Sequence, residues 1–112
     1  MPLVTIRTSS VDVSDDIGFM KELSKELSSL TGKPESYVMT TFDKDVSMTF
    51  AGTTDPACYV EVKSIGSLNP SQISQSLSTI IESWTGVSKS RIYIQFEDVS
   101  PSNWGFNGST FG

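Results

Sequence analysis

Two short stretches decide the fold that this sequence predicts: Ser29-Leu30-Thr31-Gly32 and, 54 residues later, Ser83-Trp84-Thr85-Gly86. Other pairs match at the same offset without gaps: Pro2 with Pro56, Leu23-Ser24 with Leu77-Ser78, Ser36 with Ser90, and Phe42-Asp43 with Phe96-Glu97. Each match is weak alone, but their common offset predicts a duplicated unit. The 112 residues should then form a single domain, 1–112, built of two pseudo-repeats, 1–54 and 55–112.

The first repeat reads strand, helix, strand. Residues 3–8 alternate between apolar and polar, and residues 37–42 are rich in aromatic and β-branched residues, so both segments are predicted strands. Between them we expect a helix that Ser14 caps and Gly32 ends. The helix should bury one apolar stripe, which consists of Ile17, Met20, Leu23, Leu27 and Leu30.

The second repeat follows the same plan. Strands are predicted over 57–65 and 91–96, and the helix between them should run from an Asn69 cap, with Pro70 in its first position, to Gly86. Its predicted stripe consists of Ile73, Leu77, Ile80, Ile81 and Trp84. Residues 101–112 carry three aromatic side chains among small polar ones, which predicts a tail that packs rather than a disordered one.

Two such units predict an α+β fold: a tandem βαβ repeat whose four-stranded sheet carries both helices on one face. If the residues of the other face are partly apolar, that face needs a cover as well. In so short a chain the obvious cover is another copy of the same chain, so we expect an oligomer.

The composition excludes several classes of function. Eight Lys and Arg against 13 Asp and Glu give a net charge of -5, which disfavours binding to nucleic acid. The absence of histidine and the single cysteine, Cys58, exclude an internal disulfide, Cys/His zinc sites and Ser-His-Asp or Cys-His nucleophiles. No apolar run approaches the roughly 20 residues of a membrane helix. The first residues lack the features of a signal peptide, so we expect a cytoplasmic protein.

The N-terminus offers a candidate base. Removal of Met1 would expose the secondary amine of Pro2, and burial or a nearby lysine lowers the pKa of such an amine from its usual value of about 7.7–8.0. Lys33, directly after the helix-ending Gly32, is the second candidate. Both features also have plainer interpretations, because Met-Pro starts are common and a lysine at a helix end is usually exposed to water.

Five motifs run in order along essentially the whole chain: the Met1-Pro2 start, Thr31-Gly32-Lys33-Pro34, Ser64-Ile65-Gly66, Arg91-Ile92-Tyr93-Ile94 and Asn107-Gly108-Ser109-Thr110-Phe111. No single motif is specific, but the ordered set resembles the macrophage migration inhibitory factor family of the tautomerase superfamily. The resemblance implies a homotrimer in which three sheets form a barrel ringed by helices, with an active site at each subunit interface. It also implies keto–enol tautomerisation of arylpyruvates such as phenylpyruvate, and of dopachrome-like compounds, without cofactor or metal.

The resemblance further implies roles for individual residues. Pro2 would be the catalytic base, and Lys33 would pair with the substrate carboxylate and help to keep the proline amine neutral. Tyr93 would reach the pocket from a neighbouring subunit. The other implied contacts are the backbone of Ser64 and Ile65 and the aromatic side chains of Tyr37, Phe106 and Phe111.

Some positions depart from the family pattern. Gln95 replaces a substrate-binding asparagine of the mammalian members, Lys63 replaces a histidine, and Trp104 replaces a smaller residue and could narrow the pocket. Arylpyruvate activity could therefore be weak, or the substrate different. The mammalian Cys-x-x-Cys motif is absent, so a thiol–disulfide oxidoreductase has no chemical basis here.

Two other functions stay open at this point. The chain could be a cytokine-like signalling or binding protein with a vestigial pocket, and leaderless secretion occurs in this family. It could instead hydrate or dehalogenate small unsaturated acids. That chemistry calls for additional arginines near the base, and the chain has only Arg7 and Arg91.

Overall fold

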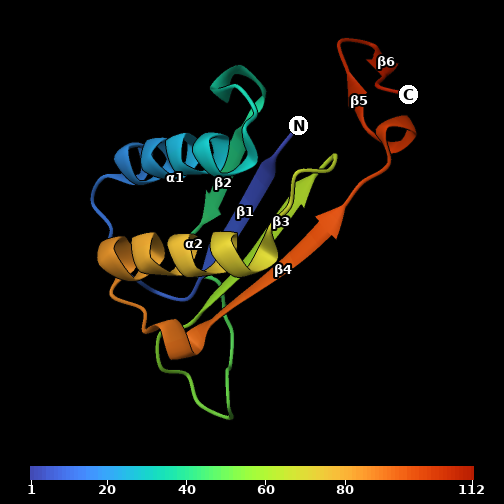
Figure 1. The fold of residues 1–112 in the computed structure, drawn as a ribbon. Coiled ribbons are helices and arrows are strands. Elements are labelled where there is room, and N and C mark those ends of the chain that lie inside the picture. Colours follow the sequence, from blue (N-terminus) through green and yellow to red (C-terminus); the bar gives the residue numbers. More distant parts are fainter.

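The computed structural model describes all residues, 1–112, and it confirms the α+β fold with both helices on one face of a four-stranded sheet (Figure 1). The elements of the first half are β1 (Leu3–Thr8), α1 (Asp16–Thr31), the 3-10 turn η1 (Glu35–Tyr37) and β2 (Met39–Asp43). Those of the second half are β3 (Cys58–Ser64), α2 (Pro70–Thr85), η2 (Lys89–Arg91), β4 (Ile92–Asp98), η3 (Pro101–Asn103), β5 (Gly105–Phe106) and β6 (Ser109–Thr110).

The sheet has the strand order β2-β1-β3-β4. Each half contributes one parallel pair, β1 with β2 and β3 with β4, and its helix makes the crossover that a parallel pair requires. The two halves meet at the centre through the antiparallel pair β1–β3, in which Leu3 lies opposite Lys63. The helices begin at Asp16 and Pro70 and the 3-10 turns at Glu35 and Lys89, so the same element order recurs at a spacing of 54 residues.

One hydrophobic cluster fills the space between the sheet and the helices. It includes Phe19, Leu23 and Leu27 of α1 and Ile73, Leu77 and Ile81 of α2, all without solvent exposure. The Phe19 ring lies edge-on to Phe42 at 5.1 Å and tilted against Trp84 at 5.7 Å. Because this cluster joins elements of both halves, neither half has a separate core.

The predicted apolar stripe of the first helix was wrong at its start. Ile17 is 65% exposed, and the fully buried side chain in the first turns is that of Phe19. Beside Ile17, Asp16 is partly buried and its carboxylate pairs with Lys44 at 3.0 Å. The observed stripe keeps Met20, Leu23 and Leu27 of the predicted one but begins at Phe19, and Ile17 faces solvent.

The helix ends follow the predicted signals with one correction. Gly32 and Gly86 end the two helices in the left-handed conformation, at φ 69° and 75°. The Asn69 side chain caps α2, as predicted, but the cap of α1 is Asp15 rather than Ser14. The Asp15 carboxylate accepts a hydrogen bond from the Gly18 amide at 3.0 Å.

Two predicted strands start later than the sequence indicated. A 3-10 turn takes up residues 35–37, so β2 begins at Met39 and Tyr37 lies outside the sheet. The turn η2 likewise includes Arg91, so β4 begins at Ile92. In both places the chain makes one tight turn after the helix before it joins the parallel neighbour.

The sheet face opposite the helices is more polar than expected. No other helix or strand covers it, and only Phe50, from the connection between β2 and β3, packs on Tyr93 at its edge (Figure 1). The register places on it Leu3, Thr5, Arg7, Met39, Thr41, Asp43, Tyr59, Glu61, Lys63, Tyr93, Gln95 and Glu97. Large exposed apolar groups occur there only at its margins, at Met39 and Tyr93. None of the helices is long and apolar enough to cross a membrane.

Residues 101–112, here called the C-terminal arm, extend beyond the end of the sheet (Figure 1). The arm is ordered as η3 followed by the hairpin β5–β6, and the Phe111 amide donates to the carbonyls of Pro101 and Trp104. All of its residues except Trp104 are exposed, so the predicted packing tail is a hairpin that folds mainly on itself.

Candidate active site

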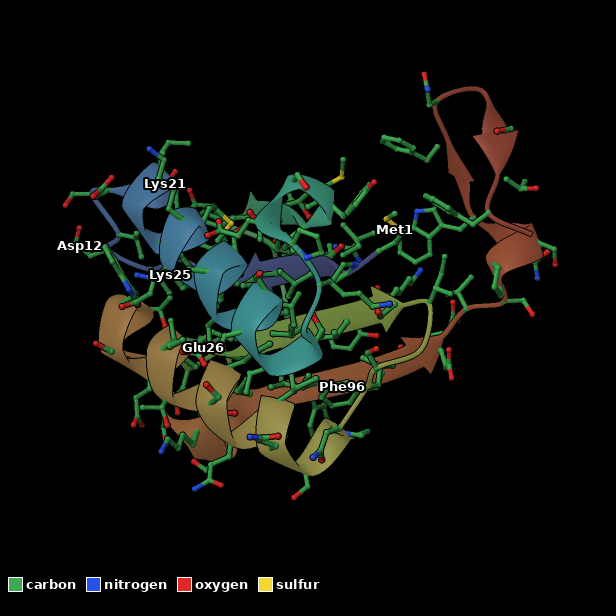
Figure 2. All side chains as sticks on the ribbon, turned by 45° about the horizontal axis from the view of Figure 1, so that its top comes forward. Met1, Asp12, Lys21, Lys25, Glu26 and Phe96 are labelled. Carbon is green, nitrogen blue, oxygen red and sulfur yellow. The ribbon has the colours of Figure 1, made fainter.

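The candidate site lies where β1 begins and β3 and β4 end. Met1 lies at the free end of β1, between the sheet and the C-terminal arm (Figure 2). Pro2 is buried, and its carbonyl accepts a hydrogen bond from the Met39 amide at 3.0 Å. The start of the chain is thereby fastened to the first residue of β2, which gives the N-terminus a fixed place in the fold.

A cavity of about 360 Å³, here called the Lys33 cavity, opens beside the N-terminus. Four of the predicted site residues contribute to it, from three separate parts of the chain. The lining consists of Met1, Lys33, Pro34, Tyr37, Ile65, Pro101 and Phe111. The structure therefore brings Lys33, Tyr37, Ile65 and Phe111 to one cavity.

A second cavity, also about 360 Å³ and here called the Pro2 cavity, adjoins the first. Its lining is mostly apolar and consists of Met1, Pro2, Leu3, Ser36, Tyr37, Val38, Met39, Trp104, Gly105 and Phe106. Met1 and Tyr37 line both cavities, so these two residues form their common wall. Each cavity lies in the size range of small-molecule sites, about 300–1,000 Å³.

Aromatic side chains form the outer wall of this region. The Tyr37 and Phe106 rings meet edge to face at 5.8 Å, and the Phe106 and Phe111 rings stack at 5.8 Å. All three are exposed to 39–53%, more than a core residue would be. Exposed rings at the mouth of an apolar cavity suit a ligand with a flat apolar group.

The end of α1 places Lys33. Gly32 turns the chain out of the helix, and two hydroxyl groups of the helix then hold the Lys33 backbone. The Ser28 hydroxyl donates to the Lys33 carbonyl at 2.5 Å, and the Thr31 hydroxyl accepts from the Lys33 amide at 3.4 Å. Lys33 itself is half-buried.

The Lys33 cavity is lined by two residues that carry amines, Met1 and Lys33, and neither amine forms an ion pair. No Asp or Glu lines either cavity, and the ion pairs of the structure join other residues. Burial, and next the charge of Lys33, lower the pKa of the α-amine of Met1 from its ordinary value. The cavity can thus hold an anion at Lys33 beside an amine that gives up its proton readily.

Ser64 and Ile65, the two residues after Lys63, differ in their position relative to the cavities. The Ser64 side chain is fully buried and its hydroxyl has no hydrogen-bond partner, while its carbonyl accepts from the Val99 amide at 2.8 Å. Ile65 lines the Lys33 cavity. The next amide, that of Gly66, donates to the Asp98 carboxylate at 2.9 Å. Of this segment, only Ile65 lines either cavity.

Comparison with known proteins gives one consistent answer. A family model described as macrophage migration inhibitory factor (MIF) matches residues 1–112. The chain belongs to the MIF family. This family is part of the tautomerase superfamily of isomerases, and it is known for tautomerase and cytokine roles.

Individual MIF proteins match over nearly their whole length. The crystal structure of the MIF homologue from Prochlorococcus marinus is 50% identical, with a TM-score of 0.94 over 98% of this chain and 99% of that one. The MIF homolog of Brugia malayi is 36% identical over the full length of both chains. MIF from Rattus norvegicus is 35% identical over 99% of each chain.

Two residues that the MIF resemblance assigned to the site lie away from it within one chain. Tyr93 is paired through Tyr59 with Arg7, which is four residues, roughly 13 Å, along β1 from Leu3. The Tyr93 ring packs on Phe50 at 4.7 Å. Gln95, two residues further along β4, accepts a hydrogen bond from the Tyr59 hydroxyl at 2.9 Å.

Several lining residues were not predicted. Met1 itself is one, because the MIF resemblance implies that Met1 is removed and that Pro2 is the N-terminal residue of the site. Pro34 and Pro101 are others, and a signal existed for both: Pro34 adjoins Lys33, and Pro101 begins the predicted aromatic tail. No sequence motif indicated a site at Ser36, Val38 or Met39, because their place beside Pro2 follows only from the parallel pairing of β1 with β2.

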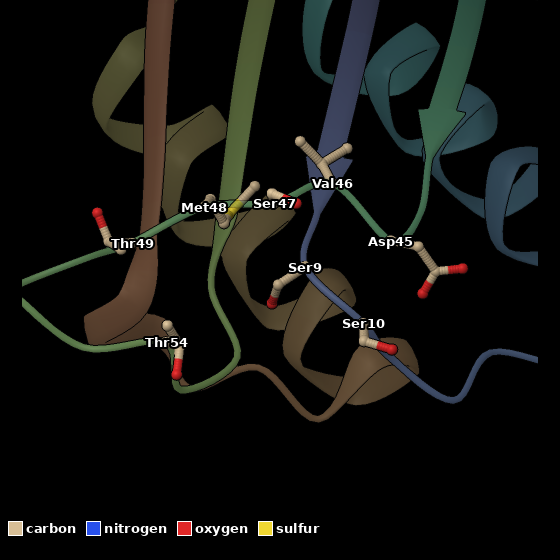
Figure 3. A pocket seen from close by; sticks show the side chains of 8 residues that line it. All are labelled: Ser9, Ser10, Asp45, Val46, Ser47, Met48, Thr49 and Thr54. Atoms are coloured by element: carbon tan, nitrogen blue, oxygen red, sulfur yellow. The ribbon is translucent and has the colours of Figure 1, made fainter.

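A further cavity, of about 610 Å³, lies at the opposite end of the sheet (Figure 3). Its lining is rich in hydroxyl groups and consists of Ser9, Ser10, Asp45, Val46, Ser47, Met48, Thr49 and Thr54. No predicted site residue takes part in it. No three His, Cys, Asp or Glu side chains of the chain gather as a potential metal site.

Proposed function

We propose that the chain is a cofactor-free keto–enol tautomerase of arylpyruvate-type substrates, with the amine of Pro2 as general base after removal of Met1. The observation that carries the proposal is that Pro2 and Lys33 line two adjoining cavities, which share Met1 and Tyr37 and have no carboxylate in their lining. A substrate carboxylate supplies the missing negative charge. Burial and the Lys33 charge lower the pKa of the α-amine of Met1 at this end of the sheet. We expect the same two causes to act on the Pro2 amine once Met1 is removed, which would suit a base at neutral pH.

In the proposed reaction the keto acid binds with its carboxylate at Lys33 and its ring against Tyr37, Phe106 and Phe111. The neutral amine removes a proton from the carbon next to the carbonyl, and negative charge develops on the carbonyl oxygen. The Lys33 ammonium stabilises this charge. The proton is then returned to the oxygen, which gives the enol, and the reverse sequence gives the keto form.

We also infer a homotrimer whose sites are shared between subunits. The family membership, the uncovered sheet face and the separation of Tyr93 and Gln95 from Pro2 all support it. In such an assembly the β4 residues of one subunit complete the cavities of the next. The altered positions Lys63, Gln95 and Trp104 would then adjust which substrate is preferred.

The test is phenylpyruvate tautomerisation, followed by ultraviolet absorbance, with protein shown by intact mass to lack Met1. Pro2→Gly should lower the rate by about 10²-fold or more, the usual contribution of a general base. Pro56→Ala is the matched control, because Pro56 is the counterpart of Pro2 in the second half and is exposed. Equal rates for wild type and Pro2→Gly would exclude Pro2 as the base.

A form that keeps Met1 sharpens the test. It is obtained by cleaving a fusion in vitro directly before Met1, out of reach of aminopeptidases. In this form the Pro2 nitrogen is an amide without basicity, and Met1 lines both cavities, so the rate should match that of Pro2→Gly. Activity at the wild-type level would contradict the proposed mechanism.

A cytokine-like or binding role with a weak or vestigial pocket is the second candidate, because the family is also known for cytokine roles. The same variants separate the two functions. If a signalling or binding activity persists in Pro2→Gly and Lys33→Ala while tautomerisation is lost, that activity does not depend on the pocket.

A further inference from the structure

The Lys33 backbone is held at both of its polar atoms by the last turns of α1. Thr31 accepts from the Lys33 amide while its own hydroxyl donates to the Leu27 carbonyl at 2.7 Å. Ser28, five residues before Lys33, reaches forward past the helix end and donates to the Lys33 carbonyl at 2.5 Å. The Ser28 contact is half-buried, which protects it from competition by water.

The second half of the chain provides an internal comparison for these two bonds. At the end of α2 the Thr85 hydroxyl donates to the Ile81 carbonyl at 2.7 Å and accepts from the Val87 amide at 3.1 Å. This repeats the Thr31 arrangement 54 residues later. The threonine bond therefore belongs to the way in which both helices end.

The Ser28 bond has no counterpart in the second half. The equivalent position is Glu82, whose carboxylate accepts from the Lys89 amide at 3.2 Å, and no side chain donates to the Val87 carbonyl. Val87 does not need such a bond, because its side chain is fully buried and core packing holds it in place. Lys33 is half-buried and has no ion-pair partner, so packing does not hold it in the same way.

We propose that Ser28 is a positioning residue for Lys33: its hydrogen bond fixes the Lys33 backbone and thereby holds the ammonium in the Lys33 cavity. The proposal rests on the function proposed above. A lysine side chain has several freely rotating bonds, and a fixed starting point reduces the ordering that substrate binding must bring about. Ser28 itself lines neither cavity, so its effect is transmitted through Lys33.

The test variant is Ser28→Ala, which keeps a good helix former at this position and should fold. KM for phenylpyruvate should rise by about three- to tenfold, the scale of one lost hydrogen bond, while kcat changes less. The acidic limb of the kcat/KM profile should also move to higher pH, because a displaced Lys33 charge would lower the pKa of the Pro2 amine less. Ser28→Thr, which keeps the hydroxyl, should restore both values.

Two controls separate positioning from general destabilisation. Ser29→Ala changes the exposed neighbour of Ser28 on the same helix. Thr85→Ala removes the repeated cap bond in the second half, and should lower stability without a change in the pH profile. If Ser28→Ala gives the same KM and the same profile as Ser29→Ala, the proposal is overturned.

A measurement without turnover distinguishes this proposal from the proposed function. Binding of phenylacetate, a non-reacting aryl carboxylate, is measured by calorimetry for wild type, Ser28→Ala and Lys33→Ala. Weaker binding in both variants supports the proposal. Weaker binding in Lys33→Ala alone overturns the role of Ser28 and leaves the function standing, and unchanged binding in Lys33→Ala overturns both.

Discussion

The α-amine of Met1 and the side chain of Lys33 line the same cavity, and neither forms an ion pair with a carboxylate. Burial, and next the charge of Lys33, lower the pKa of the Met1 α-amine from its ordinary value. A bound anion would interact favourably with these unpaired amines. This is the reason to expect acid–base chemistry on a carboxylate substrate at this end of the sheet.

Replacement of Lys33 should change the pH dependence of tautomerisation. The active form of the base is the neutral amine, so kcat/KM rises with pH through the pKa of that amine. For the α-amine of Met1, burial is the first cause of the lowered pKa and the Lys33 charge is the second. If the Pro2 amine is subject to the same two causes, the first remains in Lys33→Ala and the second is lost. The pKa should therefore rise and the acidic limb move to higher pH. Lys33→Arg, which keeps the charge, should retain the wild-type limb; an unmoved limb in Lys33→Ala would contradict this explanation.

Mixed oligomers should reveal a shared site. Pro2→Gly and Tyr93→Ala chains, each defective alone, should regain activity when they are unfolded and refolded together. With a site shared between neighbours, an equal mixture contains about a quarter of intact sites. Pro2→Gly with Lys33→Ala is the control and should not recover, because Pro2 and Lys33 lie together within one chain. Equal recovery in the two mixtures, or none in either, would argue against a contribution of Tyr93 from a neighbour.

Phe19 should contribute far more to stability than Ile17, although the sequence suggested the reverse. Phe19 has no solvent exposure and contacts the rings of Phe42 and Trp84, whereas Ile17 is 65% exposed. Phe19→Ala should lower the free energy of unfolding by about 3–5 kcal/mol. Ile17→Ala should change it by less than about 0.5 kcal/mol. Urea denaturation at one fixed protein concentration measures both values, and similar losses would show that α1 packs differently.

The thiol of Cys58 should be inert in the folded protein. It is 2% exposed, and burial raises its pKa to about 12, so the reactive thiolate is scarce at pH 8. Ellman's reagent should find almost no thiol in the native protein and one per chain in guanidinium chloride. Rapid reaction in the absence of denaturant would show that the β3 region opens.

The features that the sequence predicted correctly depend on short-range interactions. Gly32 and Gly86 end their helices because glycine adopts the left-handed conformation at little cost, and Asn69 caps α2 because its side chain reaches an amide three residues away. Alternation, and for residues 37–42 the aromatic and β-branched composition, were enough to locate the four main strands. Such signals lie within one turn or one strand, so the sequence displays them directly.

The remaining features depend on how distant segments pack. Ile17 and Phe19 are both apolar, and only the docking of α1 on the sheet, with Asp16 turned towards Lys44, determines which of them is buried. The sheet register places Tyr93 and Gln95 away from Pro2 within one chain. Met1 and Lys33 are separated by a whole strand and helix, and only the folded structure brings them to one cavity and lowers the pKa of the amine. The sequence by itself thus determined the elements and their order, whereas the tertiary structure decided which side chains share an environment, because burial and charge act through space.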